Sequence, residues 1–161
     1  MFRRPLAACA LLASLAGSPG CGGASEPAPA PAPGADVSCT DDPRLDTYAG
    51  ELDKAGEQGL LSFRFFDLEP APPAKGSNTF HVQVSDVAGD IMQGELRVDL
   101  RMPDHGHGTS VEPVVSFDAA SAAYTITPLF LFMPGVWRLE FEAVDAAMAI
   151  DRSVLHFCIE G

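Results

Sequence analysis

The chain has 161 residues, 47% of them hydrophobic, and it carries 10 basic against 22 acidic side chains, a formal net charge of −12. This length is sufficient for one globular domain with short additions. A surface this acidic argues against nucleic acid and anionic lipid headgroups as partners, because both repel negative charge. The sequence also lacks a Gly-x-Ser-x-Gly elbow, a phosphate-binding loop and a His-Glu-x-x-His helix, so we do not expect an enzyme.

Residues 1–20 have the pattern of a bacterial lipoprotein signal peptide. Arg3 and Arg4 precede a short apolar run over residues 6–16. That run is too short to span a bilayer as a permanent helix, so we expect this segment to be removed on export.

Cys21 follows directly and is similar to the acylated cysteine of a bacterial lipoprotein. Residues 21–35 form a linker in which Pro and Ala alternate, a composition that favours extended polyproline II. A signal, an acylatable cysteine and a Pro-rich spacer occur in the order that a membrane-anchored protein needs. We therefore expect a lipid anchor at Cys21, on the periplasmic side of a bacterial membrane. The alternative is ordinary cleavage near Ala24, which would release a free periplasmic protein.

Residues 36–161 form the expected globular domain, with Cys39 near its start and Cys158 near its end. An even pair of cysteines in an exported domain indicates a structural disulfide. The two cysteines are not in a Cys-x-x-Cys spacing, which weakens the alternative that they bind metal or carry out redox chemistry.

The hydrophobic pattern of this domain is typical of β-strands. Apolar and polar side chains alternate in short segments that are separated by turn residues. The clearest segment runs from Glu95 to Met102, and the others are residues 61–65, 80–84, 115–117, 124–126, 137–141 and 155–159. This pattern predicts an all-β fold, an immunoglobulin-like antiparallel β-sandwich.

One segment departs from the strand pattern. Leu45, Tyr48 and Leu52 recur at helical spacing between Asp42 and Gly56. The sequence therefore predicts one short N-terminal helix before the first strand.

Two histidines and two methionines form the most informative motif. His105 and His107 lie in the run Met102-Pro-Asp-His-Gly-His-Gly, and Met133 stands in a second Met-Pro step. Met102 ends an expected strand and Met133 precedes one, so the four side chains could meet at one end of a sandwich. Imidazole nitrogen combined with thioether sulfur favours copper over magnesium, calcium or manganese. The motif predicts a copper site formed by these four residues.

Each of these residues also has a structural explanation. Met102 could be a core residue, and Met133 could fill a gap beneath Trp137, since thioethers pack well on aromatic rings. The two imidazoles could donate hydrogen bonds to backbone carbonyls and hold the loop. The second interpretation is therefore a structural or protein-interaction module whose His-Gly-His loop binds no metal.

Residues 78–142 resemble the YtkA-like and FixH-like domains of exported or membrane-attached bacterial proteins. The resemblance rests on the run 102–108 and on the pattern Tyr124…Phe132-Met-Pro-Gly-Val-Trp137. Such domains are similar in fold to periplasmic copper-handling sandwiches, and some members occur beside copper transport or oxidase assembly systems. The resemblance thus implies copper as the bound metal and a copper-handling envelope protein as partner, with metal storage, sensing or delivery as the function.

Overall fold

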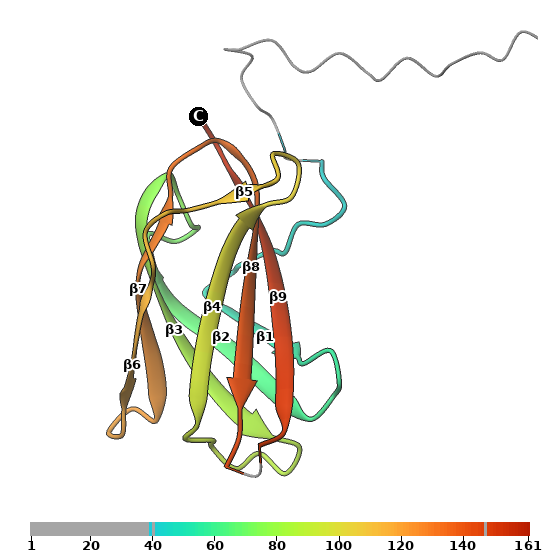
Figure 1. Cartoon of the computed structure of the whole chain (residues 1–161), viewed down its shortest axis with the longest axis vertical. Coiled ribbons are helices and arrows are strands. Elements are labelled where there is room, and N and C mark those ends of the chain that lie inside the picture. The colour runs from blue at the N-terminus through green and yellow to red at the C-terminus, as the bar shows by residue number, and fades with distance from the viewer. Residues whose placement is uncertain (1–38, 40, 147) are drawn as a thin grey trace, which may run out of the picture. The chain divides into compact units, whose positions relative to one another are not determined.

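The structure is a computed structural model that describes Cys39, residues 41–146 and residues 148–161 (Figure 1). These residues lie in a compact unit that runs from Gly34 to Gly161. The expected signal peptide, the lipid anchor at Cys21 and the linker up to residue 35 lie outside the described residues. Within the described part, no helix is long and apolar enough to cross a membrane.

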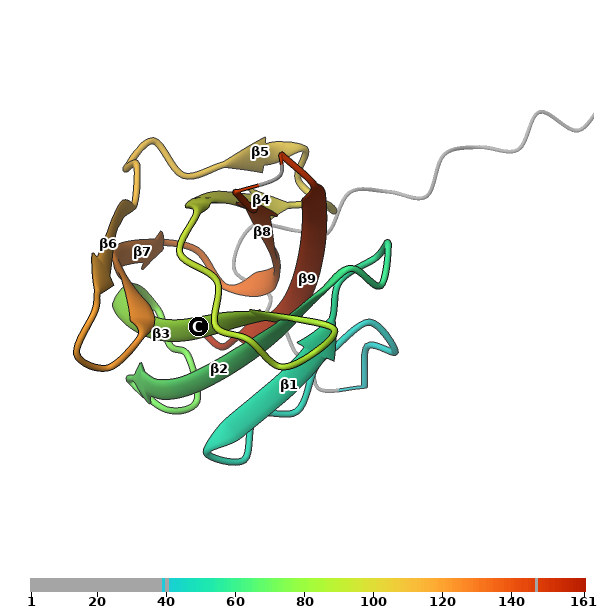
Figure 2. The same ribbon diagram turned by 90° about the horizontal axis from the view of Figure 1, so that it is seen from below.

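The described part of the chain folds as two antiparallel sheets. Its strands, in chain order, are β1 (Glu51–Ala55), β2 (Leu61–Glu69), β3 (Gly76–Asp86), β4 (Glu95–Met102), β5 (His107–Gly108), β6 (Val114–Asp118), β7 (Ala123–Leu131), β8 (Gly135–Val144) and β9 (Ile150–Ile159). One sheet has the order β1-β2-β3-β7-β6 and the other β5-β4-β8-β9 (Figure 2). The all-β antiparallel sandwich predicted from the sequence is confirmed.

Alternating side chains of the two sheets form one hydrophobic core. On β2, Phe63 and Phe65 are fully buried, whereas Arg64 between them is exposed. Across the sandwich, Phe65 meets Phe141 of β8 edge to face, with 4.8 Å between the ring centroids. Burial of every second residue is the pattern of a strand with one buried face, and the alternation in the sequence predicts it.

The pairing of β4 with β8 determines what lies at one end of the sandwich. β4 ends at Met102, as the sequence predicts, and its penultimate residue Arg101 lies opposite Arg138. Since the strands are antiparallel, the end of β4 lies near the start of β8 at Gly135. The loop that carries Met133 enters β8 at this end.

The prediction of a short helix within residues 42–56 is wrong. Leu52 lies in β1, and the residues before it follow the outer edge of β9. The N–H of Asp46 donates to the carbonyl of His156 at 2.9 Å, and the N–H of His156 donates to the Asp46 carboxylate at 2.8 Å. A short isolated helix is marginal in water, and these bonds to the edge of a sheet override its propensity.

The disulfide predicted between Cys39 and Cys158 is confirmed. The Cα atoms of the two cysteines are 5.5 Å apart, and the bond joins residues 119 apart in sequence. Cys158 lies opposite Val136 near the start of β8. The bond therefore fixes the N-terminal segment at the end of the sandwich where β4 ends.

Candidate functional site

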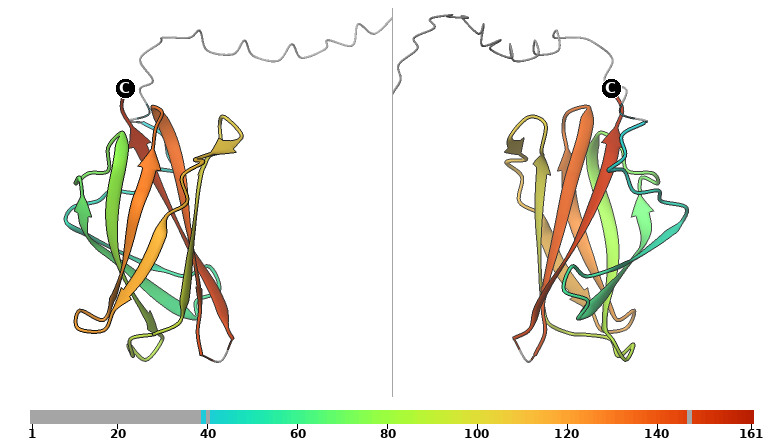
Figure 3. Two further views of the ribbon diagram at one scale, coloured as in Figure 1. Left: turned by 60° about the vertical axis from the view of Figure 1, so that its left-hand side comes forward. Right: turned by 90° about the vertical axis from the view of Figure 1, so that its right-hand side faces the viewer.

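The two histidines lie on a short hairpin at that end of the sandwich, beyond the last residue of β4 (Figure 3). After Met102 the chain turns, and β5 returns with His107 opposite Met102. The Met102 carbonyl accepts hydrogen bonds from the N–H groups of His105 at 3.2 Å and Gly106 at 2.9 Å. Gly106 has a φ of 69°, a left-handed conformation that glycine adopts without strain. The Gly-containing motif thus closes a tight turn that presents both imidazoles.

Met102 and His105 approach each other beside Gly135, the first residue of β8. A Cβ atom placed on Gly135 would lie 2.8 Å from Cε of Met102 and 3.8 Å from Nε2 of His105. Met102 is fully buried, whereas His105 is exposed to solvent. The Met102 methyl group and the His105 imidazole therefore both lie against the position that a side chain at Gly135 would occupy.

His107 is held beside His105 by aromatic side chains. The centroids of the two imidazoles are 5.7 Å apart, and His107 also stacks on Phe132 at 5.8 Å with an interplanar angle of 24°. Phe132 in turn meets Trp137 edge to face at 5.6 Å. The Trp137 indole N–H donates to the carbonyl of Met133 at 2.9 Å, which fixes the loop before β8. Sequence reasoning missed the role of Phe132, although its aromatic pattern with Trp137 was visible.

Met133 contributes to this end of the domain in a different way from Met102. Its side chain is half-buried and packs against the hydrophobic core. This packing agrees with the structural explanation of the residue. Of the two methionines, Met102 is the one that lies with His105 beside Gly135, and Met133 stays a predicted ligand.

The side chains that commonly bind metals do not cluster around the hairpin in the described part of the chain. Among the described residues, no group of three or more His, Cys, Asp and Glu side chains is arranged to hold a metal ion. Within the described residues, His105 and His107 thus have no third His, Cys, Asp or Glu side chain placed with them to hold a metal ion.

Arg44 connects the tip of the hairpin to the disulfide-bonded segment. Its guanidinium donates to both carboxylate oxygens of Asp104, at 3.0 and 2.7 Å, and to both oxygens of Asp42, at 2.9 and 2.6 Å. These hydrogen bonds lower the pKa of Asp104, and they lower the pKa of Asp42 to about 2. Bidentate arginine–carboxylate pairs have a well-defined geometry. The ion pair between Arg44 and Asp104 therefore orients the turn that carries His105.

The chain matches no protein-family model, no curated protein and no solved structure. The resemblance to YtkA-like and FixH-like domains therefore stays a prediction from the residues that carry it. The fold and the site define a disulfide-bonded antiparallel β-sandwich with a pair of exposed imidazoles at one end.

Proposed function

We propose that this domain binds one copper ion at the β4–β5 hairpin and stores, senses or delivers the metal in the cell envelope. The observation that carries the proposal is the approach of Met102 and Nε2 of His105 beside Gly135, with His107 next to His105. Imidazole and thioether ligands together favour copper, and the soft thioether favours Cu(I). Copper is the cargo here, and no catalytic step is assigned to it.

The packing of Met102 and the stacking of His107 support a site that is partly formed before the metal arrives. Met102 is fully buried, so its side chain is already ordered by packing. His105 and His107 are exposed, which leaves their ring nitrogens accessible from solvent. His107 is further held by its stacking on Phe132. Ordering ligands in advance reduces the entropy lost on binding.

A competition titration against a Cu(I) chelator tests this function. The full chain is expected to bind one equivalent of Cu(I), and the double variant His105→Ala/His107→Ala is expected to bind about 100-fold more weakly or worse, because two of three ligands are lost. Met102→Leu is expected to weaken Cu(I) binding more than Cu(II) binding, since only the soft ion prefers a thioether.

His81→Ala is the matched control for the histidine variants. His81 lies on β3, where its Nδ1 is 3.1 Å from the carbonyl oxygen of Asp67, and its removal is expected to leave copper affinity unchanged. Equal Cu(I) affinity in the double histidine variant and the unmodified chain would contradict the site. That result would favour the alternative function, a structural or protein-interaction module with no bound metal.

We further propose that the chain is exported and anchored by a lipid at Cys21, with a copper-handling envelope protein as its partner. The support is the order of signal, cysteine and Pro-Ala linker, together with a disulfide that requires an oxidising compartment. The intact mass of protein from the membrane fraction is expected to include a diacylglycerol or triacyl adduct. A soluble product with an unmodified start at Ser25 would refute the anchor.

A further inference from the structure

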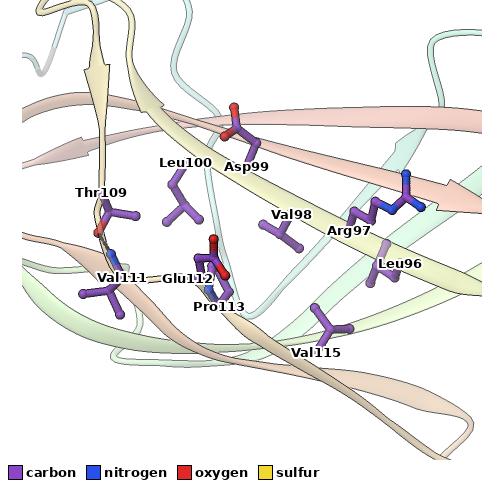
Figure 4. Close-up of a pocket in the computed structure, with 10 residues that line it drawn as sticks. All are labelled: Leu96, Arg97, Val98, Asp99, Leu100, Thr109, Val111, Glu112, Pro113 and Val115. Atoms are coloured by element: carbon purple, nitrogen blue, oxygen red, sulfur yellow. Dashed lines mark hydrogen bonds between the residues drawn. The ribbon is translucent and has the colours of Figure 1, made fainter.

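The turn that carries His105 also carries a carboxylate, that of Asp104. This residue directly precedes His105 and lies three residues before His107. The next acidic residues along the chain in either direction, Asp99 and Glu112, line a groove of about 460 Å³ beside β4 (Figure 4). Asp104 is therefore the carboxylate that lies closest in sequence to both imidazoles.

A carboxylate that joined the two imidazoles would change which copper ion the hairpin prefers. Nitrogen and oxygen donors together suit Cu(II), whereas a thioether suits Cu(I). With the carboxylate of Asp104 free to bind, the hairpin would offer Cu(II) two nitrogens and an oxygen from residues 104–107. The state of this one carboxylate thus bears on the oxidation state of the bound copper.

Arg44 engages this carboxylate at both of its oxygens. The guanidinium donates to Oδ1 of Asp104 at 3.0 Å and to Oδ2 at 2.7 Å. A positive charge so close to the carboxylate repels a metal cation at the same place. Asp104 would therefore have to leave Arg44 before it could bind copper.

Arg44 is also fixed by contacts that do not involve Asp104. The carboxylate of Asp42 accepts hydrogen bonds from Nε of Arg44 at 2.9 Å and from its Nη2 at 2.6 Å. The N–H of Asp42 donates to the carbonyl of Cys39 at 3.1 Å, and Cys39 is bonded to Cys158. The guanidinium is thus already ordered where it holds the carboxylate of Asp104.

We propose that Arg44 sets the oxidation-state preference of the hairpin: it holds the carboxylate of Asp104 away from the metal and so leaves a site that favours Cu(I). This inference rests on the proposed copper function. Arg44 acts as a positioning residue and does not touch the metal. The turn keeps its hydrogen bonds from the N–H groups of His105 and Gly106 to the Met102 carbonyl without Arg44, so the imidazoles stay on the hairpin when Arg44 is replaced.

Competition titrations of the full chain, one with a Cu(I) chelator and one with a Cu(II) chelator, test this role. Arg44→Met removes the guanidinium and keeps most of the aliphatic stem. It is expected to tighten Cu(II) binding about tenfold and to change Cu(I) binding less than about threefold, because only Cu(II) gains a preferred ligand. The reduction potential of the bound copper is then expected to fall by about 59 mV, the equivalent of a tenfold change for one electron.

Two further variants examine the carboxylate itself. Arg44→Met/Asp104→Asn is expected to lose the gain in Cu(II) affinity. The electron paramagnetic resonance spectrum of Cu(II) is expected to differ between this double variant and Arg44→Met, because only the latter has a carboxylate oxygen on the metal. Arg44→Lys is expected to give an intermediate gain, since an ammonium lacks the planar fork that holds both oxygens.

Arg101→Met is the matched control for the loss of one positive charge. Arg101 lies on β4 opposite Gly108, next to the hairpin, and pairs with Asp99. Its replacement makes the same charge change but leaves Asp104 held by Arg44. It is expected to change the affinity for either copper ion less than about threefold.

Unchanged Cu(II) affinity in Arg44→Met would overturn the role of Arg44. So would equal gains for Cu(I) and Cu(II), an equal gain in Arg101→Met, or a loss of affinity for both ions, which would show a purely structural role. Each of these results leaves the copper site standing if the unmodified chain binds Cu(I) and His105→Ala/His107→Ala does not. A chain that binds no Cu(I) would overturn the proposed function and this inference together.

Discussion

Replacing Cys39 and Cys158 together by alanine is expected to lower the free energy of unfolding by about 4–5 kcal/mol in the chain-entropy model, because the bond closes a loop of 119 residues. A cross-link over so long a loop removes many conformations from the unfolded chain. The same bond holds the start of the domain against β9, so its loss is also expected to free the segment that carries Arg44.

Chemical denaturation of the unmodified chain and the double variant measures this difference. A reducing agent is expected to destabilise the unmodified chain and to leave the double variant unaffected, which separates the loss of the bond from the loss of cysteine packing. Equal unfolding free energies for the two proteins would show that the disulfide contributes no stability.

The buried carboxylate of Asp151 lies near the start of β9, at the other end of this strand from Cys158. It is expected to make the second large contribution to the free energy of unfolding. Asp151 is fully buried, and its two oxygens accept four backbone N–H donors, from Gln58 at 2.9 Å, Leu60 at 2.8 Å, Leu61 at 3.0 Å and Arg152 at 2.8 Å. Three of these donors belong to the β1–β2 turn and the start of β2. The carboxylate thus joins one sheet to the other.

Asp151→Asn is expected to lower the free energy of unfolding by about 2–4 kcal/mol, because an amide NH₂ would face N–H groups that need an acceptor. Gly56 is packed so closely against this carboxylate that a Cβ atom there would overlap it, so the amide has no room to move away. Asp53→Asn, at an exposed position of β1, is expected to change stability by about 0.5 kcal/mol or less. A loss below about 1 kcal/mol for Asp151→Asn would contradict this role of the carboxylate.

The same carboxylate gives stability a dependence on pH. Burial alone would raise the pKa of Asp151, but the four N–H donors outweigh burial and lower the pKa below its usual 3.8. The stability it supplies is complete above the pKa of an unfolded aspartate and is lost as the pH falls through the lower pKa of the folded state. Between about pH 5 and pH 2 the unmodified chain is therefore expected to lose stability more steeply than Asp151→Asn.

The strands could be predicted because each has one buried face. β4 has the bounds that its alternation indicates, from Glu95 to Met102, and β6 and β7 include the expected segments 115–117 and 124–126. The segment before β1 could not be predicted in this way. Leu45, Tyr48 and Leu52 have helical spacing, but hydrogen bonds to the edge of β9, far along the chain, determine the conformation.

Only the position of the two histidines on a loop could be predicted from the sequence, and the long-range contacts of the site could not. His105 and His107 follow the end of a clear strand, so their place on an end loop follows from the sequence. The ion pair between Arg44 and Asp104 joins positions 60 residues apart and belongs to no motif, so no local pattern indicates it. The stacking of His107 on Phe132 likewise depends on how two loops meet, which only the packed sandwich determines.

X-ray absorption at the copper edge of the Cu(I)-loaded chain tests the proposed site most directly. The account predicts a first shell that contains imidazole nitrogen and at least one sulfur, with the sulfur contribution reduced or lost in Met102→Leu. Met148→Leu is the control, since Met148 is an exposed methionine on the turn between β8 and β9. A first shell without sulfur, or without imidazole nitrogen, would contradict a copper site built on His105, His107 and Met102.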